Sequence, residues 1–325
     1  MTTAIAAVAD GYRPGPAEIT KNTEDVLDCL VIGGGPAGLT AAIYLGRFRR
    51  RVLVVDKGWS RAEWITKSHN LPGFPEGIAG PVLLGRLRAQ ARLYGAVIET
   101  GVIDSLLRGS EAFFSATLGA VTVKAHTVIL STGVTENKPP VAHVADAVKR
   151  GLIRTCPICD GYENIGKRVA VLGAGEHAAA EALFIRTYTD QLSLLLMQGQ
   201  TAALSQSTLS ALGLAGITVF HVIIGSISVG SDGVTVLGVE DGQSHRYDAV
   251  FTAFGLTSQA MLAAGLGAKM DPHNRLIVDE HQATSVDGLF AAGDVVRGLN
   301  QISVAEGEAA IASTAVHNRL VRAFA

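Results

Sequence analysis

The chain has 325 residues, enough for two domains with separate hydrophobic cores. Its 27 Lys and Arg against 29 Asp and Glu give a formal net charge of −2, which argues against binding nucleic acid or anionic lipid through a basic field. Charged residues make up only 17% and glycines number 37, a composition typical of an α/β enzyme with tight turns and much buried surface.

Residues 1–25 are expected to form an N-terminal arm, because Pro14, Gly15 and Pro16 interrupt a polar run before the first apolar segment. The first nine residues are mildly apolar but lack a basic start, so they do not read as a signal peptide. No uncharged apolar run reaches the roughly 18 residues that a membrane helix requires. The sequence therefore predicts a cytoplasmic protein with no membrane partner.

The first motif is a glycine-rich turn between a predicted strand and a predicted helix. An apolar run at 27–32 enters Gly33-Gly34-Gly35-Pro36-Ala37-Gly38, and helical spacing follows over 39–48. In dinucleotide-binding turns the first glycine permits the turn, the second lets the backbone approach a pyrophosphate, and the third lets helix pack on strand. A second strand, 52–55, ends at Asp56, whose carboxylate can accept ribose hydroxyls. A dinucleotide site is expected here.

Four arginines, Arg47, Arg49, Arg50 and Arg51, follow the first predicted helix. They are either a solvated surface at the end of that helix or a docking site for an acidic ferredoxin.

The next stretch, 59–81, is rich in turn formers and has no clear period, and loops of that length in a compact domain are often functional. A helix is expected over 81–94 and strands over 97–107, 113–118 and 121–130. The last strand runs into Ser131-Thr132-Gly133, which is either a second close approach to a cofactor or an ordinary strand end. Pro139-Pro140 marks a break where we expect a domain boundary.

The most informative motif is Thr155-Cys156-Pro157-Ile158-Cys159-Asp160-Gly161. Two thiols separated by two residues suit thiol–disulfide exchange, and the only other cysteine, Cys29, is distant, so the pattern is not a disulfide framework. The alternative, a structural zinc site, needs a second pair of ligands, which the sequence does not supply, so no metal is expected. Asp160 can protonate a leaving thiolate or cap the next turn.

A second strand, turn and helix follow. The strand, 168–172, enters Gly173-Ala174-Gly175-Glu176-His177-Ala178, with a helix over 179–188. The next strand, 192–196, leads into Met197-Gln198-Gly199-Gln200, which has neither an acid for a ribose diol nor an arginine for a 2′-phosphate. A phosphate cradle is therefore expected without the usual nicotinamide selectivity. His177 is either part of that cradle or a surface histidine.

Short β-like runs at 218–224, 233–239 and 247–251 close this second domain, and 253–267 returns to the first. The last motif is Asp287-Gly288-Leu289-Phe290-Ala291-Ala292-Gly293-Asp294, followed by a helical run over 301–320. A strand ending in Gly-Asp presents a carboxylate that can accept a sugar-alcohol hydroxyl. The following helix can direct its N-terminal N–H groups at a flavin ring and stabilise a negative charge there.

Taken in order, these motifs, together with Asn70-Leu71-Pro72-Gly73, resemble the low-molecular-weight thioredoxin reductases over residues 26–322. The resemblance implies an α/β fold with two Rossmann-like nucleotide-binding domains and a homodimer. The expected domains are a discontinuous FAD-binding domain at 26–138 and 251–325, and an inserted redox-disulfide domain at 139–250.

The resemblance also implies roles for individual residues. Cys156, Cys159 and Asp160 are the expected catalytic group: Cys159 faces the flavin, Cys156 attacks the substrate, and Asp160 is the general acid. The expected contacts of FAD are Gly33, Gly35, Pro36, Ala37, Gly38, Asp56, Lys57, Asn70, Thr132, Gly133, Gly293, Asp294, Gln301 and Ile302. The second nucleotide site is expected at Gly173, Gly175, Glu176 and His177.

One departure from the family pattern changes the functional prediction. NADPH-using members carry a His-Arg-Arg run after the second nucleotide-binding strand, where this chain has Leu196-Met197-Gln198. Leu299-Asn300-Gln301-Ile302-Ser303 and Phe184-Ile185-Arg186-Thr187-Tyr188 are most similar to the diflavin-linked disulfide oxidoreductases. The second cradle is then expected to hold a second FAD.

The predicted function is an FAD-dependent thiol–disulfide oxidoreductase that exchanges electrons with a thioredoxin-like protein or a small dithiol, without NADPH. The alternatives are an NADPH- or ferredoxin-dependent thioredoxin reductase, an oxygen-dependent dithiol oxidase, and a non-catalytic flavin-binding redox sensor. The direction of electron flow is not decided by the residues, because it depends on reduction potentials.

Overall fold

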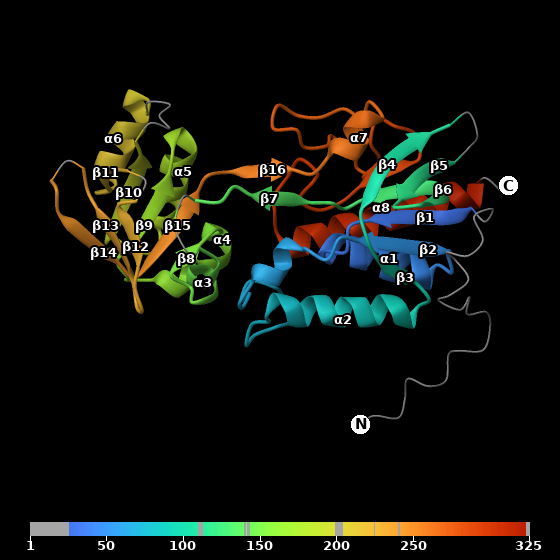
Figure 1. The fold of residues 1–325 in the computed structure, drawn as a ribbon, viewed down its shortest axis with the longest axis horizontal. Coiled ribbons are helices and arrows are strands. Elements are labelled where there is room, and N and C mark those ends of the chain that lie inside the picture. The colour runs from blue at the N-terminus through green and yellow to red at the C-terminus, as the bar shows by residue number, and fades with distance from the viewer. Residues whose placement is uncertain are drawn as a thin grey trace, which may run out of the picture. The chain divides into compact units, whose positions relative to one another are not determined.

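A computed structural model describes residues 26–109, 113–139, 141, 144–198, 204–223, 225–239 and 241–322. The predicted arm at 1–25, Pro140 of the predicted break, and Gly199-Gln200 lie outside these ranges. The described chain packs as two compact units (Figure 1). The first contains 26–62, 82–133 and 258–322, and the second contains 63–81 and 134–257. The mixed α/β fold expected from the sequence is confirmed.

The first unit is built on one large sheet in the order β3-β2-β1-β6-β5-β4, with β17 also pairing with β6. Its strands are β1 Leu27–Ile32, β2 Val52–Asp56, β3 Val97–Thr100, β4 Ile103–Arg108, β5 Phe114–Leu118, β6 Val121–Leu130 and β17 Leu289–Ala291. Its helices are α1 Pro36–Arg47, most of α2 Gly80–Leu93, α7 Met261–Gly265 and α8 Ile302–Arg322. A short 3-10 helix, η1 Arg61–Trp64, follows β2 and crosses into the second unit.

Alternate residues of the central strand β1 enter two different cores, because side chains along a strand point to opposite faces. Cys29 and Val31 pack with α1 and α8 on one face. Leu30 and Ile32 pack on the other face with Phe114 of the antiparallel β4-β5-β6 meander. Figure 1 shows α1 and α8 together on the same side of this sheet. The first glycine turn therefore leaves the end of a strand that is buried on both faces.

The second unit is built on the parallel sheet β11-β10-β9-β15-β8 and the antiparallel sheet β12-β13-β14. Its strands are β7 Val134–Glu136, β8 Ile153–Arg154, β9 Val169–Gly173, β10 Leu192–Met197, β11 Thr218–Val222, β12 Ile227–Val229, β13 Val234–Leu237, β14 Ser244–Tyr247, β15 Ala249–Ala253 and most of β16 Leu256–Ser258. Its helices are α3 Val144–Lys149, α4 Pro157–Asp160, the 3-10 turn η2 Tyr162–Asn164, α5 Gly175–Ile185 and α6 Gln206–Leu214.

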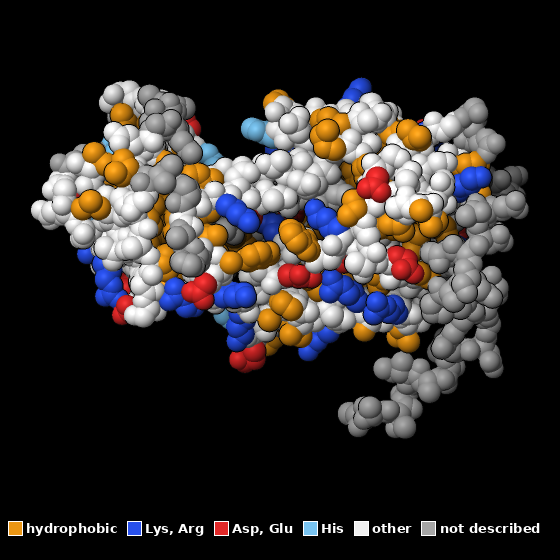
Figure 2. Space-filling view, viewed as in Figure 1, with side chains coloured by type: hydrophobic (Ala, Val, Ile, Leu, Met, Phe, Trp, Pro, Cys, Tyr) orange, Lys and Arg blue, Asp and Glu red, His pale blue; other side chains and the backbone are white. Residues whose placement is uncertain are grey.

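Here too the parallel sheet separates two cores. Val171 and Leu194 pack against α5 and α6. Leu172 and Leu195 pack against the antiparallel sheet, where Tyr247 is almost fully buried. On the face drawn in Figure 2, acidic and basic side chains are interspersed with apolar ones. Among the described residues, every helix is too short or too polar to cross a membrane.

Two predicted strands were wrong in their extent. The run expected over 97–107 is two strands, because Gly101 donates its N–H to Asp56 O at 2.9 Å and the chain then leaves β3 for the antiparallel meander. The run expected over 247–251 is divided by Asp248, whose N–H donates to Arg168 O at 2.8 Å. Tyr247 ends β14, and Ala249 begins the parallel strand β15.

Candidate active site

The redox pair is a disulfide at the start of a single helical turn in the second unit. Cys156 and Cys159 are joined with an S–S distance of 2.06 Å. Cys156 is extended, Pro157 opens α4, and the Cys159 N–H donates to Cys156 Sγ at 3.1 Å. Proline suits this first helical position because its missing N–H has no partner there in any helix. The sequence thus folds the two sulfurs onto one turn, with both residues partly exposed.

Asp160 ends the same turn, and its side chain turns toward β8 instead of capping a helix. Its Oδ1 accepts a hydrogen bond from Arg154 at 3.1 Å, and only 20% of the side chain is exposed. The Asn164 side chain donates to the Asp160 backbone carbonyl at 2.8 Å. Burial raises the pKa of the Asp160 carboxyl, with a smaller rise from Glu163, while Arg154 and His69 oppose it. Burial therefore favours the neutral acid, which is the form that can donate a proton.

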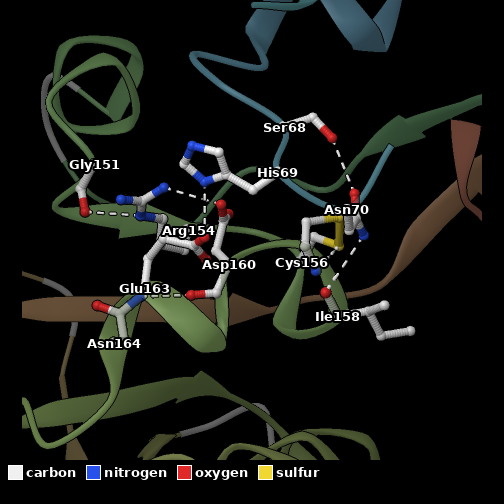
Figure 3. Close-up of polar contacts among 11 residues, drawn as sticks. Ser68, His69, Asn70, Gly151, Arg154, Cys156, Ile158, Asp160, Glu163 and Asn164 are labelled. Carbon is white, nitrogen blue, oxygen red and sulfur yellow. Dashed lines mark hydrogen bonds and ion pairs between the residues drawn. A yellow bond between two sulfur atoms is a disulfide. The ribbon is translucent and has the colours of Figure 1, made fainter. Parts of the chain in front are cut away.

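Three residues of the turn-rich stretch lie beside the disulfide, as Figure 3 shows. Asn70 donates from Nδ2 to Ile158 O, between the two cysteines, at 3.5 Å, and accepts from Ser68 Oγ at 2.9 Å. His69 Nδ1 lies 2.8 Å from Glu163 Oε1. The segment 63–81 belongs to the compact unit that holds the disulfide, so these contacts lie within one unit. The sequence prediction included Asn70 among the flavin contacts; the structure places it at the disulfide turn.

The first glycine turn shows which glycines are required and why. A Cβ on Gly33, which has φ +114°, would overlap Ser131 O, and one on Gly38 would overlap Gly33 O. A Cβ on Gly34 would overlap the Asp56 carboxyl. At Gly35, by contrast, the described atom that a Cβ meets within 4 Å is Ser60 Oγ at 3.3 Å.

Protein atoms therefore occupy the side-chain positions of three of these glycines, whereas the side-chain position of Gly35 has free space. That opening fits a phosphate, which binds where helix N–H groups are exposed and no side chain intervenes. Pro36 opens α1 and Ala37 is buried beneath it. The cradle is built from the residues that the sequence indicated, with Gly34 as an addition.

Asp56 is 6% exposed and already has partners inside the chain. Its Oδ1 accepts from the Gly58 N–H at 2.9 Å, and its Oδ2 lies 3.1 Å from Arg88 NH2. Each carboxylate oxygen can accept more than one hydrogen bond, so the group still has capacity for ribose hydroxyls. Lys57 is exposed.

The last motif lies next to the first cradle. Gly293, with φ +82°, has no room for a Cβ, which would lie 2.9 Å from Ala37 Cβ. Its N–H donates to Glu308 Oε2 of α8 at 2.7 Å. Asp294 pairs with Arg61 at 3.2 Å, and burial raises its pKa more than Arg61 lowers it.

The remaining predicted residues surround the same place. Gly133, with φ +64°, has its side-chain position 3.9 Å from Asp294 Cβ. Thr132 Oγ1 donates to Gln259 O at 2.7 Å. Gln301 directly precedes α8, and Ile302 is its first residue. The first unit therefore places Gly133 beside Asp294, and Gln301 and Ile302 at the start of the helix whose Glu308 accepts from Gly293.

The second cradle lies at the end of β9. A Cβ on Gly173 would lie 2.6 Å from Ala253 O, and Gly175 begins α5 with φ +60°. The Glu176 carboxylate accepts from Ser205 N–H at 2.7 Å and from Thr208 Oγ1 at 2.5 Å, so it caps the N-terminus of α6. His177 is 58% exposed and pairs with Glu181 at 3.2 Å, which raises its pKa.

Comparisons with known proteins place this arrangement in a family. Residues 27–309 match the family model described as pyridine nucleotide-disulphide oxidoreductase. The chain belongs to this family. It is 30% identical over 302 residues to a thioredoxin reductase of Listeria innocua, covering 89% of this chain and 92% of that protein.

Two solved structures are also similar. The crystal structure of HlmI is 27% identical, with a TM-score of 0.84 over 96% of this chain and 95% of that one. The atypical thioredoxin reductase TRi of Desulfovibrio vulgaris Hildenborough is 34% identical, with a TM-score of 0.51 over 90% of this chain and 98% of that one. This pyridine nucleotide-disulphide oxidoreductase is thus a thioredoxin reductase-like flavin disulfide oxidoreductase, a class that binds FAD.

For such an oxidoreductase the sequence prediction missed several polar side chains at both sites. They are Arg61, His69, Arg154, Glu163 and Glu308. Each of these side chains contacts a partner that is distant along the chain or on another element, so no local sequence motif identifies it. His69 carried the best available signal, a titratable residue inside a turn-rich stretch next to Asn70. Within the described ranges, no three His, Cys, Asp or Glu side chains gather as metal ligands.

Proposed function

We propose that this oxidoreductase exchanges two electrons between FAD, the Cys156–Cys159 pair and an external dithiol or disulfide, without using NADPH. The observation that supports this function is a disulfide on a partly exposed helical turn, directly followed by Asp160, a carboxyl whose pKa is raised by burial. Thioredoxin-like proteins and small dithiols are the proposed partners, since the similar proteins include thioredoxin reductases. A homodimer is proposed from the family resemblance.

The proposed residues for FAD are those of the first unit. Gly35 and the N-terminus of α1 would receive the pyrophosphate, and Asp56 the adenosine ribose. Asp294, held by Arg61, would accept a hydroxyl of the ribityl chain. FAD supplies the two-electron chemistry when bound. The protein groups orient it, while Asp160 supplies and receives a proton at its carboxyl oxygens.

The second cradle supports the proposal that NADPH is not the electron donor. Residues 197–205, from the end of β10 to the cap of α6, contain no Lys or Arg to pair with a 2′-phosphate. The Glu176 carboxylate also lies at the N-terminus of α6, where it opposes a second negative group. An FAD lacks the 2′-phosphate, which is why a second FAD is proposed for this cradle.

The four-arginine cluster gives little support to a ferredoxin donor. Arg50 donates to His317 Nδ1 at 3.1 Å and lies 3.6 Å from Asp28. The Arg47 guanidinium lies over the Tyr94 ring, 4.8 Å from its centroid. Both groups have structural partners within the first unit, which weighs against a docking role for the cluster.

The test is an anaerobic reduction experiment on the purified holoenzyme. Flavin released per chain is counted, and flavin absorbance is followed after mixing with NADPH, NADH, reduced ferredoxin or dithiothreitol. We expect two flavins per chain, no nicotinamide response, and reduction by dithiothreitol that Cys159→Ser abolishes. Bleaching by NADPH within seconds would overturn the proposal, and full dithiol exchange by Cys159→Ser would instead support a non-catalytic sensor.

A further inference from the structure

A second charged pair lies next to Asp160, and the function above gives it no role. Glu163 in η2 places Oε1 2.8 Å from His69 Nδ1. Its other oxygen, Oε2, is buried and has no hydrogen-bond partner among the described residues. Glu163 follows Asp160 by three residues, and Figure 3 shows the two carboxyl side chains close together, with Arg154 on one side and His69 on the other.

The pair is built from two separate segments. Glu163 is on the turn that follows the disulfide, and His69 is in the turn-rich stretch that also places Asn70 at Ile158 O. A Cβ on Gly77 would overlap the His69 ring, so this glycine leaves the ring its space. The His69 side chain is 39% exposed, and that of Glu163 is 26% exposed. A histidine is held here against a carboxylate whose second oxygen has no hydrogen-bond partner among the described residues.

The geometry points to a role in proton handling: we propose that Glu163 and His69 are positioning residues that control when Asp160 carries the proton for thiol–disulfide exchange. The inference rests on the proposed role of Asp160 as the general acid. Glu163 contributes a negative charge that disfavours a second negative charge on Asp160. His69 partly cancels that charge when its ring is protonated. The two residues therefore act on Asp160 in opposite directions, which agrees with the directions of their effects on its pKa.

The chemical step balances within the groups present. An external thiolate attacks Cys156 Sγ, a mixed disulfide forms there, and the Cys156–Cys159 bond breaks. The electron pair of that bond leaves with Cys159 Sγ, which takes the proton from Asp160. Asp160 becomes a carboxylate, and the reverse exchange returns the proton. No other oxidant or reductant enters this step.

All charged or titratable groups around Asp160 must be considered before a pH dependence is assigned. Arg154 comes from β8, Glu163 from η2 and His69 from the turn-rich stretch. Tyr188 follows α5, and its ring packs where a Cβ on Gly161 would be. Arg154 contacts Asp160 directly, so changing it would remove a hydrogen bond as well as a charge. Glu163 and His69 act without such a bond, which makes them the cleaner test.

The experiment measures dithiol exchange against pH in the full holoenzyme. Each variant's rate is divided by the wild-type rate at the same pH, so that the ionisation of the external thiol cancels. Because a general acid must be protonated, the rate falls as pH rises through the pKa of Asp160. Glu163→Gln should move that fall to lower pH and lower the rate ratio about tenfold at high pH. His69→Gln should move the fall in rate to higher pH and raise the ratio of variant to wild-type rate.

Glu76→Gln is the matched control, since Glu76 is an exposed carboxylate in the same stretch with no described contact at the disulfide. Its ratio should stay flat with pH. Infrared difference spectra of the Asp160 carboxyl, assigned by its loss in Asp160→Asn, should show the same two opposite shifts without turnover.

The inference would be overturned if Glu163→Gln and His69→Gln moved the fall in rate in the same direction, or if either variant lost rate uniformly at every pH. A pH fall that persists in Asp160→Asn would instead contradict the proposed role of Asp160 itself. A response to NADPH would contradict the proposal that NADPH is not the electron donor, and it would leave both of these results unchanged.

Discussion

Gly38 is a residue whose lack of a side chain matters directly to the first cradle. A Cβ there would overlap Gly33 O and lie 2.6 Å from Ser131 Oγ. The turn also packs closely against β6 at Gly33, where a Cβ would overlap Ser131 O. A single methyl group at this position must therefore displace either α1 or the turn that it follows.

We expect Gly38→Ala to lower flavin content and thermal stability together. Gly85→Ala is the control, since Gly85 is also helical but has nothing within 4 Å of its side-chain position. That change should stabilise the protein slightly, by about 0.5–1 kcal/mol, because alanine favours helix over glycine. Flavin absorbance per chain and the melting temperature measure both effects. Normal flavin content in Gly38→Ala would show that the cradle can expand.

Asp287 joins elements that are far apart in the sequence of the first unit. Its carboxylate accepts from Arg319 of α8 at 2.6 Å and from Arg108 of β4 at 2.7 Å. These two arginines lower its pKa from 3.8 to about 2. The Asp287 side chain is 64% exposed, so solvent and salt reduce the contribution of these ion pairs to folding stability to less than about 1 kcal/mol.

The sign of the pH effect follows from the lowered pKa. The ionised form is favoured by folding, so its stabilisation is complete above about pH 4 and is lost as pH falls through about 2. Asp287→Asn should therefore melt lower than the wild type near neutral pH, by about 2 °C at most. The two melting temperatures should converge toward pH 2. A difference that stays constant across this range would show that packing, and not the charge, is responsible.

At the scale of the whole molecule, each compact unit has its own hydrophobic cores. Leu53 of β2 and Leu194 of β10 are both fully buried, each on the strand next to the one that enters a glycine turn. Replacing either leucine by alanine should lower the free energy of unfolding by about 2–5 kcal/mol, because apolar transfer energy is lost and a cavity is left behind.

Because the cores are separate, the two substitutions should affect different unfolding transitions in calorimetry. Leu53→Ala should lower the temperature of the unfolding transition that coincides with release of flavin from the first cradle. Leu194→Ala should lower the temperature of the other unfolding transition and leave flavin release at its wild-type temperature. Equal effects of both variants on one common transition would show that the units unfold as a single cooperative body.

Much of this organisation was readable from the sequence because its signals are local. Both glycine turns, the acid at the end of β2 and the Cys-x-x-Cys motif are local signals, in which backbone conformation and chemistry depend on neighbouring residues. The predicted helices and the strands β1, β2 and β6 lie within a few residues of their observed bounds. The failures occurred where pairing partners decide the outcome: 97–107 and 247–251 were each predicted as one strand, and the fold divides each between two strands.

The sequence by itself determined the fold class, the first dinucleotide cradle as a motif and the redox disulfide. The tertiary structure decided which side chains control that chemistry. His69 meets Glu163 across 94 residues, and Arg61 meets Asp294 across 233. A hydrogen bond or ion pair acts over a few ångströms and has no preferred separation along the chain, so only folding reveals which charges become neighbours.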